Sequence, residues 1–157
     1  GINEIEYNTF DIGLTTKEIL RRFIVLVERD GYTVEFNCDN DTVVIGDEKK
    51  IEQAIYNLIS NAVNYTGEDK IVIINVRNLG EYVQFEVVDT GKGIPKEEID
   101  HIWDRYYKSG KTHKRSVIGT GLGLSIVKTI LMTHNVNFGV DSILGKGSKF
   151  WFQLKTK

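Results

Sequence analysis

The run Asn57-Leu58-Ile59-Ser60-Asn61-Ala62 places two asparagines four residues apart in a segment with helical periodicity. Residues at i and i+4 lie on one face of a helix, so both carboxamide oxygens can reach a single hard cation. Asparagine is a poor residue for a helix interior, because its side chain competes for backbone hydrogen bonds. The pair therefore indicates a functional site, with a solvated helix face as the simpler alternative.

Three further blocks follow it in order: Asp89-Thr90-Gly91-Lys92-Gly93-Ile94, Gly119-Thr120-Gly121-Leu122-Gly123-Leu124 and Gly145-Lys146-Gly147-Ser148. Asp89 ends an apolar strand, where its carboxylate can accept from an exocyclic amino group and favour adenine over guanine. The glycines after it let backbone approach a flat base. The next block opens a helix whose free N–H groups face phosphate oxygens, and the last is a turn beside the base. Each block alone is also typical of an ordinary turn; together they predict a nucleotide pocket.

In order and spacing, the four blocks resemble the N, G1, G2 and G3 boxes of the histidine-kinase catalytic domain. Between the second and third blocks, the run Ile102-Trp103-Asp104-Arg105-Tyr106-Tyr107-Lys108 is similar to the aromatic F box of that family. The resemblance covers about residues 8–155. It implies the Bergerat fold, an α+β two-layer sandwich with a mixed, mainly antiparallel sheet of about five strands, covered on one face by three helices.

Periodicity predicts elements that agree with this fold. Strands are expected at about residues 7–11, 32–38, 42–45, 71–78, 82–89, 136–143 and 148–154. Helices are expected at about 16–29, from 47 to 65, briefly after Pro95, and from Gly121. Thr15 or Thr16 is the expected cap of the first helix, Asp47 the cap of the second, and Gly31 the stop of the first.

Composition is typical of one globular domain: the chain has 157 residues, 41% of them hydrophobic, so residues 1–157 are expected to form a single domain. The net charge of −2 gives no reason to expect nucleic-acid binding. No apolar run approaches the roughly 18 residues of a membrane span. Cys38 is the only cysteine, which excludes an internal disulfide and fits a reducing compartment.

The three histidines, His101, His113 and His134, lack the close spacing of a zinc site. None is followed by the acidic residue and helical context of a phosphoacceptor H box. We therefore expect neither a histidine-based metal site nor a phosphoacceptor within this chain.

The resemblance assigns the site residue by residue. It implies that Asn61 is the direct Mg²⁺ ligand, that Asn57 supports the metal and the phosphates of ATP, and that Tyr65 lies along the nucleotide. The other residues expected at ATP are Asp89, Gly91, Gly93, Ile94, Tyr107, Lys108, Gly119, Thr120, Gly121, Leu122, Gly123, Leu124 and Ser148. Asn57, Asn61 and Lys108 are the ones expected to take part in catalysis.

One position departs from the family pattern, which often has lysine three residues after the second asparagine. This chain has Asn64 there, expected to be exposed, so other cations must meet the phosphate charge. Lys108 is the first candidate, although its point charge is not equivalent to the arginine that the family has there. Residues 109–116 correspond to the ATP lid, or more simply to a solvated loop. Trp103 and its aromatic neighbours fit the core as well as an F box.

The implied activity is transfer of the γ-phosphoryl group from Mg-ATP to a histidine on a separate dimerisation and phosphoacceptor domain, N-terminal to Gly1. A response regulator would act downstream. The resemblance further implies a monomeric fragment of a homodimeric protein, on the cytoplasmic side of a membrane-anchored sensor kinase. Same-fold ATPases and serine kinases are the alternatives, but they usually carry glutamate where this chain has Asn57. A nucleotide-gated interaction module is a third, because Asn64 replaces a cation.

Overall fold

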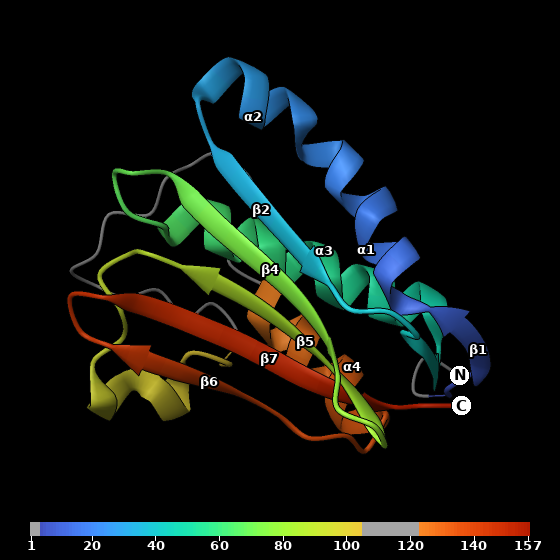
Figure 1. Ribbon diagram of the computed structural model, residues 1–157. Coiled ribbons are helices and arrows are strands. Elements are labelled where there is room, and N and C mark those ends of the chain that lie inside the picture. The colour runs from blue at the N-terminus through green and yellow to red at the C-terminus, as the bar shows by residue number, and fades with distance from the viewer. Residues whose placement is uncertain (1–3, 105–122) are drawn as a thin grey trace.

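A computed structural model of the protein describes residues 4–104 and 123–157, and Figure 1 shows a twisted sheet with helices on one side. In chain order the elements are β1 (Asn8–Asp11), α1 (Ile12–Leu20), the 3-10 turn η1 (Arg21–Phe23), α2 (Ile24–Asp30), β2 (Thr33–Cys38), β3 (Val43–Gly46), α3 (Glu48–Tyr65), β4 (Ile71–Asn78), β5 (Tyr82–Asp89), the 3-10 helix η2 (Lys96–His101), α4 (Gly123–Thr133), β6 (Phe138–Ile143) and β7 (Gly147–Lys155). The predicted α+β class is confirmed.

The main sheet has five strands in the order β2-β4-β5-β7-β6. Only β2 and β4 run parallel, and the other neighbouring pairs are antiparallel, as predicted. The predicted strands at 32–38 and 42–45 do not belong to one sheet, because β3 turns away from β2 and pairs with β1 in a separate two-stranded sheet. That small sheet lies where the chain enters the fold (Figure 1).

The first helix begins earlier than its sequence pattern predicts. Asp11 is the cap, and its Oδ1 accepts from the backbone N–H groups of Gly13 (2.9 Å) and Leu14 (3.3 Å). The predicted caps are wrong: the hydroxyls of Thr15 and Thr16 instead donate to backbone carbonyls four residues earlier in the chain. The helix is interrupted by η1 and ends, as predicted, at Gly31, whose φ of 76° is left-handed.

The core lies between the helices and the sheet. One stripe of α3, including Ile51, Ile55 and Leu58, is buried against the inward residues of the central strands. There Phe85 of β5 and Phe152 of β7 are paired in register and stack, with ring centroids 5.0 Å apart. Each large apolar side chain buried in this way stabilises the fold by about 1.5–3 kcal/mol. The alternation of side chains along β5 therefore determines which of its residues face the helices.

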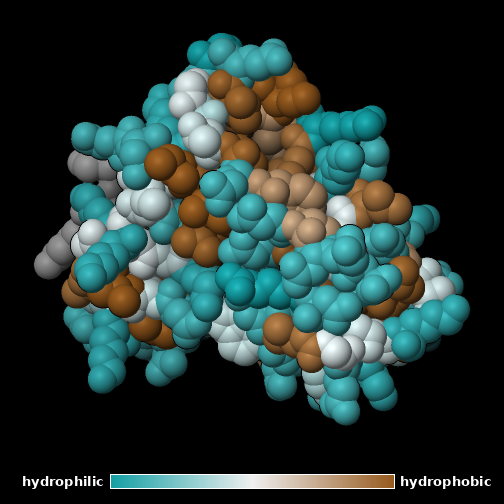
Figure 2. All heavy atoms as spheres, viewed as in Figure 1, coloured by the Kyte–Doolittle hydropathy of each residue, from teal (hydrophilic) through white to brown (hydrophobic). Residues whose placement is uncertain are grey.

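The open face of the sheet is polar at its centre, and Figure 2 shows hydrophilic residues over much of this side of the molecule. Glu86 of β5 is only 3% exposed there. Its carboxylate accepts from Asn75 (3.1 Å), Arg77 (3.1 Å) and Gln84 (2.5 Å), and Lys149 lies 3.9 Å away. Burial opposes ionisation, but these hydrogen bonds and charges lower the pKa of Glu86. Because the open face is polar and its buried charge is paired, this face of the sheet needs no covering layer of helices.

His134, just after α4, ties the end of that helix to the start of α3. It is buried, its Nδ1 lies 2.8 Å from the carbonyl oxygen of Ile130, and its Nε2 accepts from the backbone N–H of Asp47 at 3.0 Å. This arrangement requires the neutral tautomer with hydrogen on Nδ1, and burial lowers the pKa of the ring. Asp47 is also the predicted cap, accepting from the N–H of Lys50. Within the described parts of the chain, no helix is long and apolar enough to cross a membrane.

Candidate nucleotide-binding site

The C-terminal half of α3 carries one wall of the site. Asn57, Asn61 and Tyr65 are spaced four residues apart and are all partly exposed, beside the buried stripe rather than within it. Asn64 differs from its prediction, because it is buried, with only 3% of its surface exposed. A lysine ammonium at that depth would need a counter-ion, whereas a neutral carboxamide does not. Asparagine at this position is therefore compatible with the local packing.

The start of the described part of α4 lies beside this wall. A Cβ added to Gly123 would lie 3.6 Å from Cβ of Asn57, an ordinary contact distance. Leu124 is partly buried against the core. The third sequence block therefore reaches the first block in space. Its other predicted residues, Gly119, Thr120, Gly121 and Leu122, lie outside the described residues, as do Tyr107, Lys108 and the predicted lid.

Asp89 is the buried acidic group of the site, with 5% of its surface exposed. It continues the inward alternation of β5, so its carboxylate lies on the helix side of the sheet. Burial raises the pKa of Asp89 to about 6, against the effect of hydrogen bonds from the backbone amides of Gly91 and Ser148, which favour the charged form. The Gly91 bond measures 2.8 Å, and Ser148 is the register partner of Asp89 in β7. A desolvated carboxylate is a strong acceptor for a ligand amino group.

The glycines near Asp89 are required by contacts within the protein itself. A Cβ on Gly91 would lie 2.0 Å from the carbonyl oxygen of Tyr65, and one on Gly147 would lie 2.0 Å from that of Asp89. Gly93 has a φ of 76°, and its Cβ would lie 2.4 Å from the carbonyl oxygen of Ile143. These glycines bring the second and fourth blocks against α3 and against each other.

A hydrogen-bonded cluster that the sequence did not indicate links the end of α3 to the loop after β5. The Thr66 hydroxyl lies 3.1 Å from that of Thr90 and accepts from the Thr90 N–H at 3.2 Å. The Thr90 hydroxyl in turn donates to Asp69 at 2.5 Å. No spacing rule predicts these contacts, because they join segments 21 to 24 residues apart. They position the backbone that follows Asp89.

Trp103 is the one aromatic residue of the F-box run within the described part of the chain. Its ring makes edge contacts with Phe138 (5.4 Å between centroids) and Phe150 (5.5 Å). The simpler interpretation, packing against the core, is therefore confirmed for this residue. Ile94, predicted at the nucleotide, lines a pocket beside β6 that adjoins the site, because its N–H donates to Ser142 Oγ at 2.7 Å and that hydroxyl lies 2.9 Å from Ser148 Oγ.

The donor set on α3 fits Mg²⁺ that is bound together with a triphosphate. Mg²⁺ prefers oxygen ligands and keeps several waters and substrate phosphates, so one or two neutral carboxamides suffice on the protein side. Asn57 and Asn61 offer such oxygens from one partly exposed helix face. Among the described residues there is no cluster of three or more His, Cys, Asp or Glu side chains that could hold a metal alone.

Comparison with known proteins identifies the family to which this chain belongs. Residues 46–157 match the family described as histidine kinase-, DNA gyrase B- and HSP90-like ATPases, and the chain belongs to that family. Within it, the chain is similar to the catalytic domains of sensor histidine kinases. It is 37% identical over 141 residues to the sensor histidine kinase WalK of Bacillus subtilis, which covers 88% of this chain and 23% of WalK.

Two solved structures of histidine kinase ThkA are also similar. Its catalytic domain matches with a TM-score of 0.82 at 25% identity, over 96% of each chain. ThkA in complex with the response regulator protein TrrA matches with a TM-score of 0.80 at 25% identity, over 98% of this chain and 42% of ThkA. This chain thus spans only part of the relatives that it matches.

Proposed function

We propose that this chain is the catalytic, ATP-binding domain of a sensor histidine kinase, and that it transfers the γ-phosphoryl group of ATP to a histidine on a separate phosphoacceptor domain. The observation that carries the proposal is the buried Asp89 carboxylate, held at the end of β5 beside the asparagine-bearing face of α3, in a chain of this ATPase family. The similarity to WalK and ThkA supports the kinase branch.

In this mechanism Asp89 accepts a hydrogen bond from the adenine amino group and fixes the base. Asn61 would hold Mg²⁺ through its carboxamide oxygen, and Asn57 would support the metal and the phosphates. Bound Mg²⁺ would neutralise charge on the phosphate oxygens. Asn57 is not a general base, because an amide cannot take the proton of an attacking water. The site therefore favours transfer over hydrolysis, since phosphoryl transfer depends mainly on positioning and charge stabilisation.

The predicted residues 107–108 and 119–122 would complete the phosphate end of the site, with Lys108 as the nearest predicted cation. The proposed partners are the protein's own dimerisation and phosphoacceptor domain and a response regulator. The solved complex of ThkA with TrrA supports the second partner. We further propose that residues 1–157 are one domain, monomeric alone and part of a homodimer in the full protein, on the cytoplasmic side of a membrane-anchored sensor.

The test is transfer in trans. Purified chain, ATP and Mg²⁺ should label an added histidine-kinase phosphoacceptor domain with phosphate that is stable to base and labile to acid, without labelling the chain itself. Asn61→Ala should abolish transfer, because the metal loses its protein oxygen, whereas Asn37→Ala, at an exposed asparagine of β2, should not. Brisk ATP hydrolysis by the chain alone, lost in Asn57→Ala, would instead assign it to the hydrolases of the fold.

A further inference from the structure

Strand β6 forms one edge of the main sheet, since β7 is its only partner among the described strands. Its sequence, Phe-Gly-Val-Asp-Ser-Ile, contains neither lysine nor proline, which commonly block pairing at such an edge, and its one charged residue, Asp141, is paired with Lys149 of β7. At the end of this strand Ile143 and Leu144 are 62% and 63% exposed. The edge is therefore chemically open to another extended segment.

The direction of the free backbone groups follows from the hydrogen-bond ladder. The Gln153 N–H donates to the Asn137 carbonyl at 3.0 Å, just before β6 begins. Hydrogen-bonded pairs alternate along an antiparallel ladder, so Asp141 directs its backbone groups at β7. Val140 and Ser142 direct theirs to the free edge.

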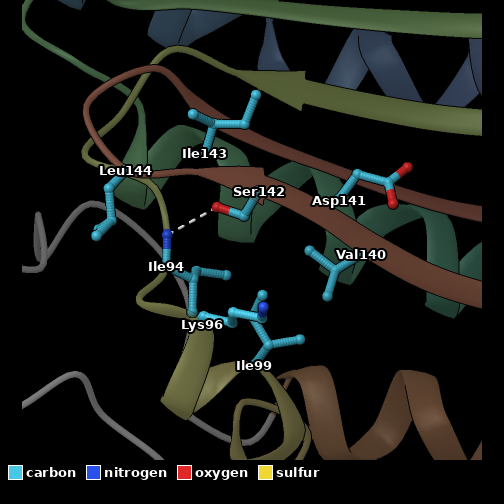
Figure 3. A pocket seen from close by; sticks show the side chains of 8 residues that line it. All are labelled: Ile94, Lys96, Ile99, Val140, Asp141, Ser142, Ile143 and Leu144. Atoms are coloured by element: carbon cyan, nitrogen blue, oxygen red, sulfur yellow. Dashed lines mark hydrogen bonds between the residues drawn. The ribbon is translucent and has the colours of Figure 1, made fainter.

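A pocket of about 460 Å³ lies along this edge. Figure 3 shows its two walls, with Val140 and Ser142 on β6 and Lys96 and Ile99 on η2. The lining is mainly apolar, and the volume is within the roughly 300–1,000 Å³ range of ligand-sized pockets. Ile94 joins the two walls through its bond to Ser142. We call this space between β6 and η2 the β6 groove.

The charges at the β6 groove are unequal. Asp141 is neutralised by Lys149, with Oδ2 and Nζ 3.6 Å apart. Lys96 forms no ion pair within residues 4–104 and 123–157. The groove therefore offers one cation for an acidic group of an incoming ligand. A single cation among apolar walls suits a polypeptide better than a free phosphate or nucleotide.

We propose that the β6 groove binds an extended polypeptide segment, supplied by another domain or protein, as an additional strand beside β6. Backbone groups of the segment pair with those of Val140 and Ser142, which is the strand-addition mode of recognition. An apolar side chain of the segment enters the pocket against Ile99, and a neighbouring acidic side chain meets Lys96. The groove adjoins the proposed nucleotide site, because Ser142 Oγ lies 2.9 Å from Ser148 Oγ and Ser148 pairs with Asp89. The inference rests on the β6 edge and on Lys96, and not on bound ATP.

The proposal can be tested with a capped eight-residue peptide, Thr-Val-Thr-Leu-Glu-Val-Thr-Thr, titrated to about 1 mM into ¹⁵N-labelled chain. Amide signals of Val140 and Ser142 should shift and gain protection from exchange. Val140→Pro removes one outward N–H without removing a bond to β7, so it should weaken binding at least tenfold and leave the amide spectrum of β5 unchanged.

A charge swap provides the second test, which holds even if Val140→Pro does not fold. Lys96→Glu should weaken the peptide about three- to fivefold and strengthen a version with lysine in place of glutamate by a similar factor. Lys17→Glu, at an exposed position of α1, makes the same change of net charge and should alter the affinity for neither peptide. No shift at the highest concentration, shifts confined to another edge, or equal binding by Lys96→Glu would overturn the proposal. Concentration-dependent shifts without peptide would replace the segment by a second copy of the chain.

Discussion

Asp89→Asn is expected to make the unliganded protein more stable and ATP binding weaker. The carboxylate is buried beside backbone donors but without a cation among the described residues, and burial raises its pKa from 3.8 to about 6. A raised carboxyl pKa means that stability present below pH 3.8 is lost as pH rises toward 6. At about 1.36 kcal/mol per pKa unit, the loss is about 3 kcal/mol as an upper estimate.

The measurement is urea unfolding of wild type and variant at about pH 4 and pH 7.5. Asparagine does not titrate, so the stability of the variant relative to wild type should rise by up to about 3 kcal/mol between these pH values. Taking the difference between pH values removes any constant cost, such as a weakened bond from Ser148. Asp41→Asn, at an exposed position, carries the same charge change and should show no such rise.

Calorimetry on the same variant gives the second half of the prediction. Loss of a charge-assisted hydrogen bond to adenine should weaken ATP about ten- to a hundredfold. General damage to the fold would lower stability and ATP affinity together. Loss of a carboxylate that binds adenine would lower only the affinity. A stability difference that is the same at both pH values, or unchanged ATP affinity, would contradict the assignment of Asp89.

Gly91→Ala should destabilise the fold by about 2 kcal/mol or more, because its Cβ would collide with the Tyr65 carbonyl oxygen. Gly46→Ala is the control, since its Cβ would make only ordinary contacts. Equal thermal stability of the two variants would contradict the prediction. His134 must stay neutral to accept from its backbone donor, so its contribution to stability should be lost as pH falls below 6.5. In urea unfolding, the stability of wild type relative to His134→Gln should therefore decrease over that range, and a difference that does not change with pH would contradict this role. Glu86→Ala should cost about 1–3 kcal/mol by leaving its donors unpaired, measured by denaturant unfolding, and a cost near zero would show that water satisfies them equally well.

Much of the fold could be predicted because its signals are local. Alternation along β5 placed Asp89 on the inward side, and the four-residue spacing on α3 placed Asn57 and Asn61 on one face. Gly31 stops its helix by left-handed geometry that few other residues adopt. These features need only the chain's own periodicity and turn chemistry.

The features that escaped prediction depend on segments that meet only in the folded chain. Asp11 replaces the threonine caps because its side chain also accepts from Thr42, 31 residues away, at 2.6 Å. Asn64 is buried by tertiary packing that helical periodicity alone does not reveal. Asp69 reaches Thr90 across the sheet end. Such contacts can be found only once the layers are assembled.

Glu86 has a consequence for how the sheet is assembled. A strand that pairs one residue out of register turns every side chain to the opposite face. For β5 such a slip would drive a carboxylate into the apolar layer against the helices, away from Arg77 and Lys149, which stabilise it on the open face. An unpaired buried charge costs several kcal/mol, more than most of the contacts that a slipped strand could regain. The charge of Glu86 therefore selects the native register, because a sheet that pairs β5 one residue out of register is strongly destabilised.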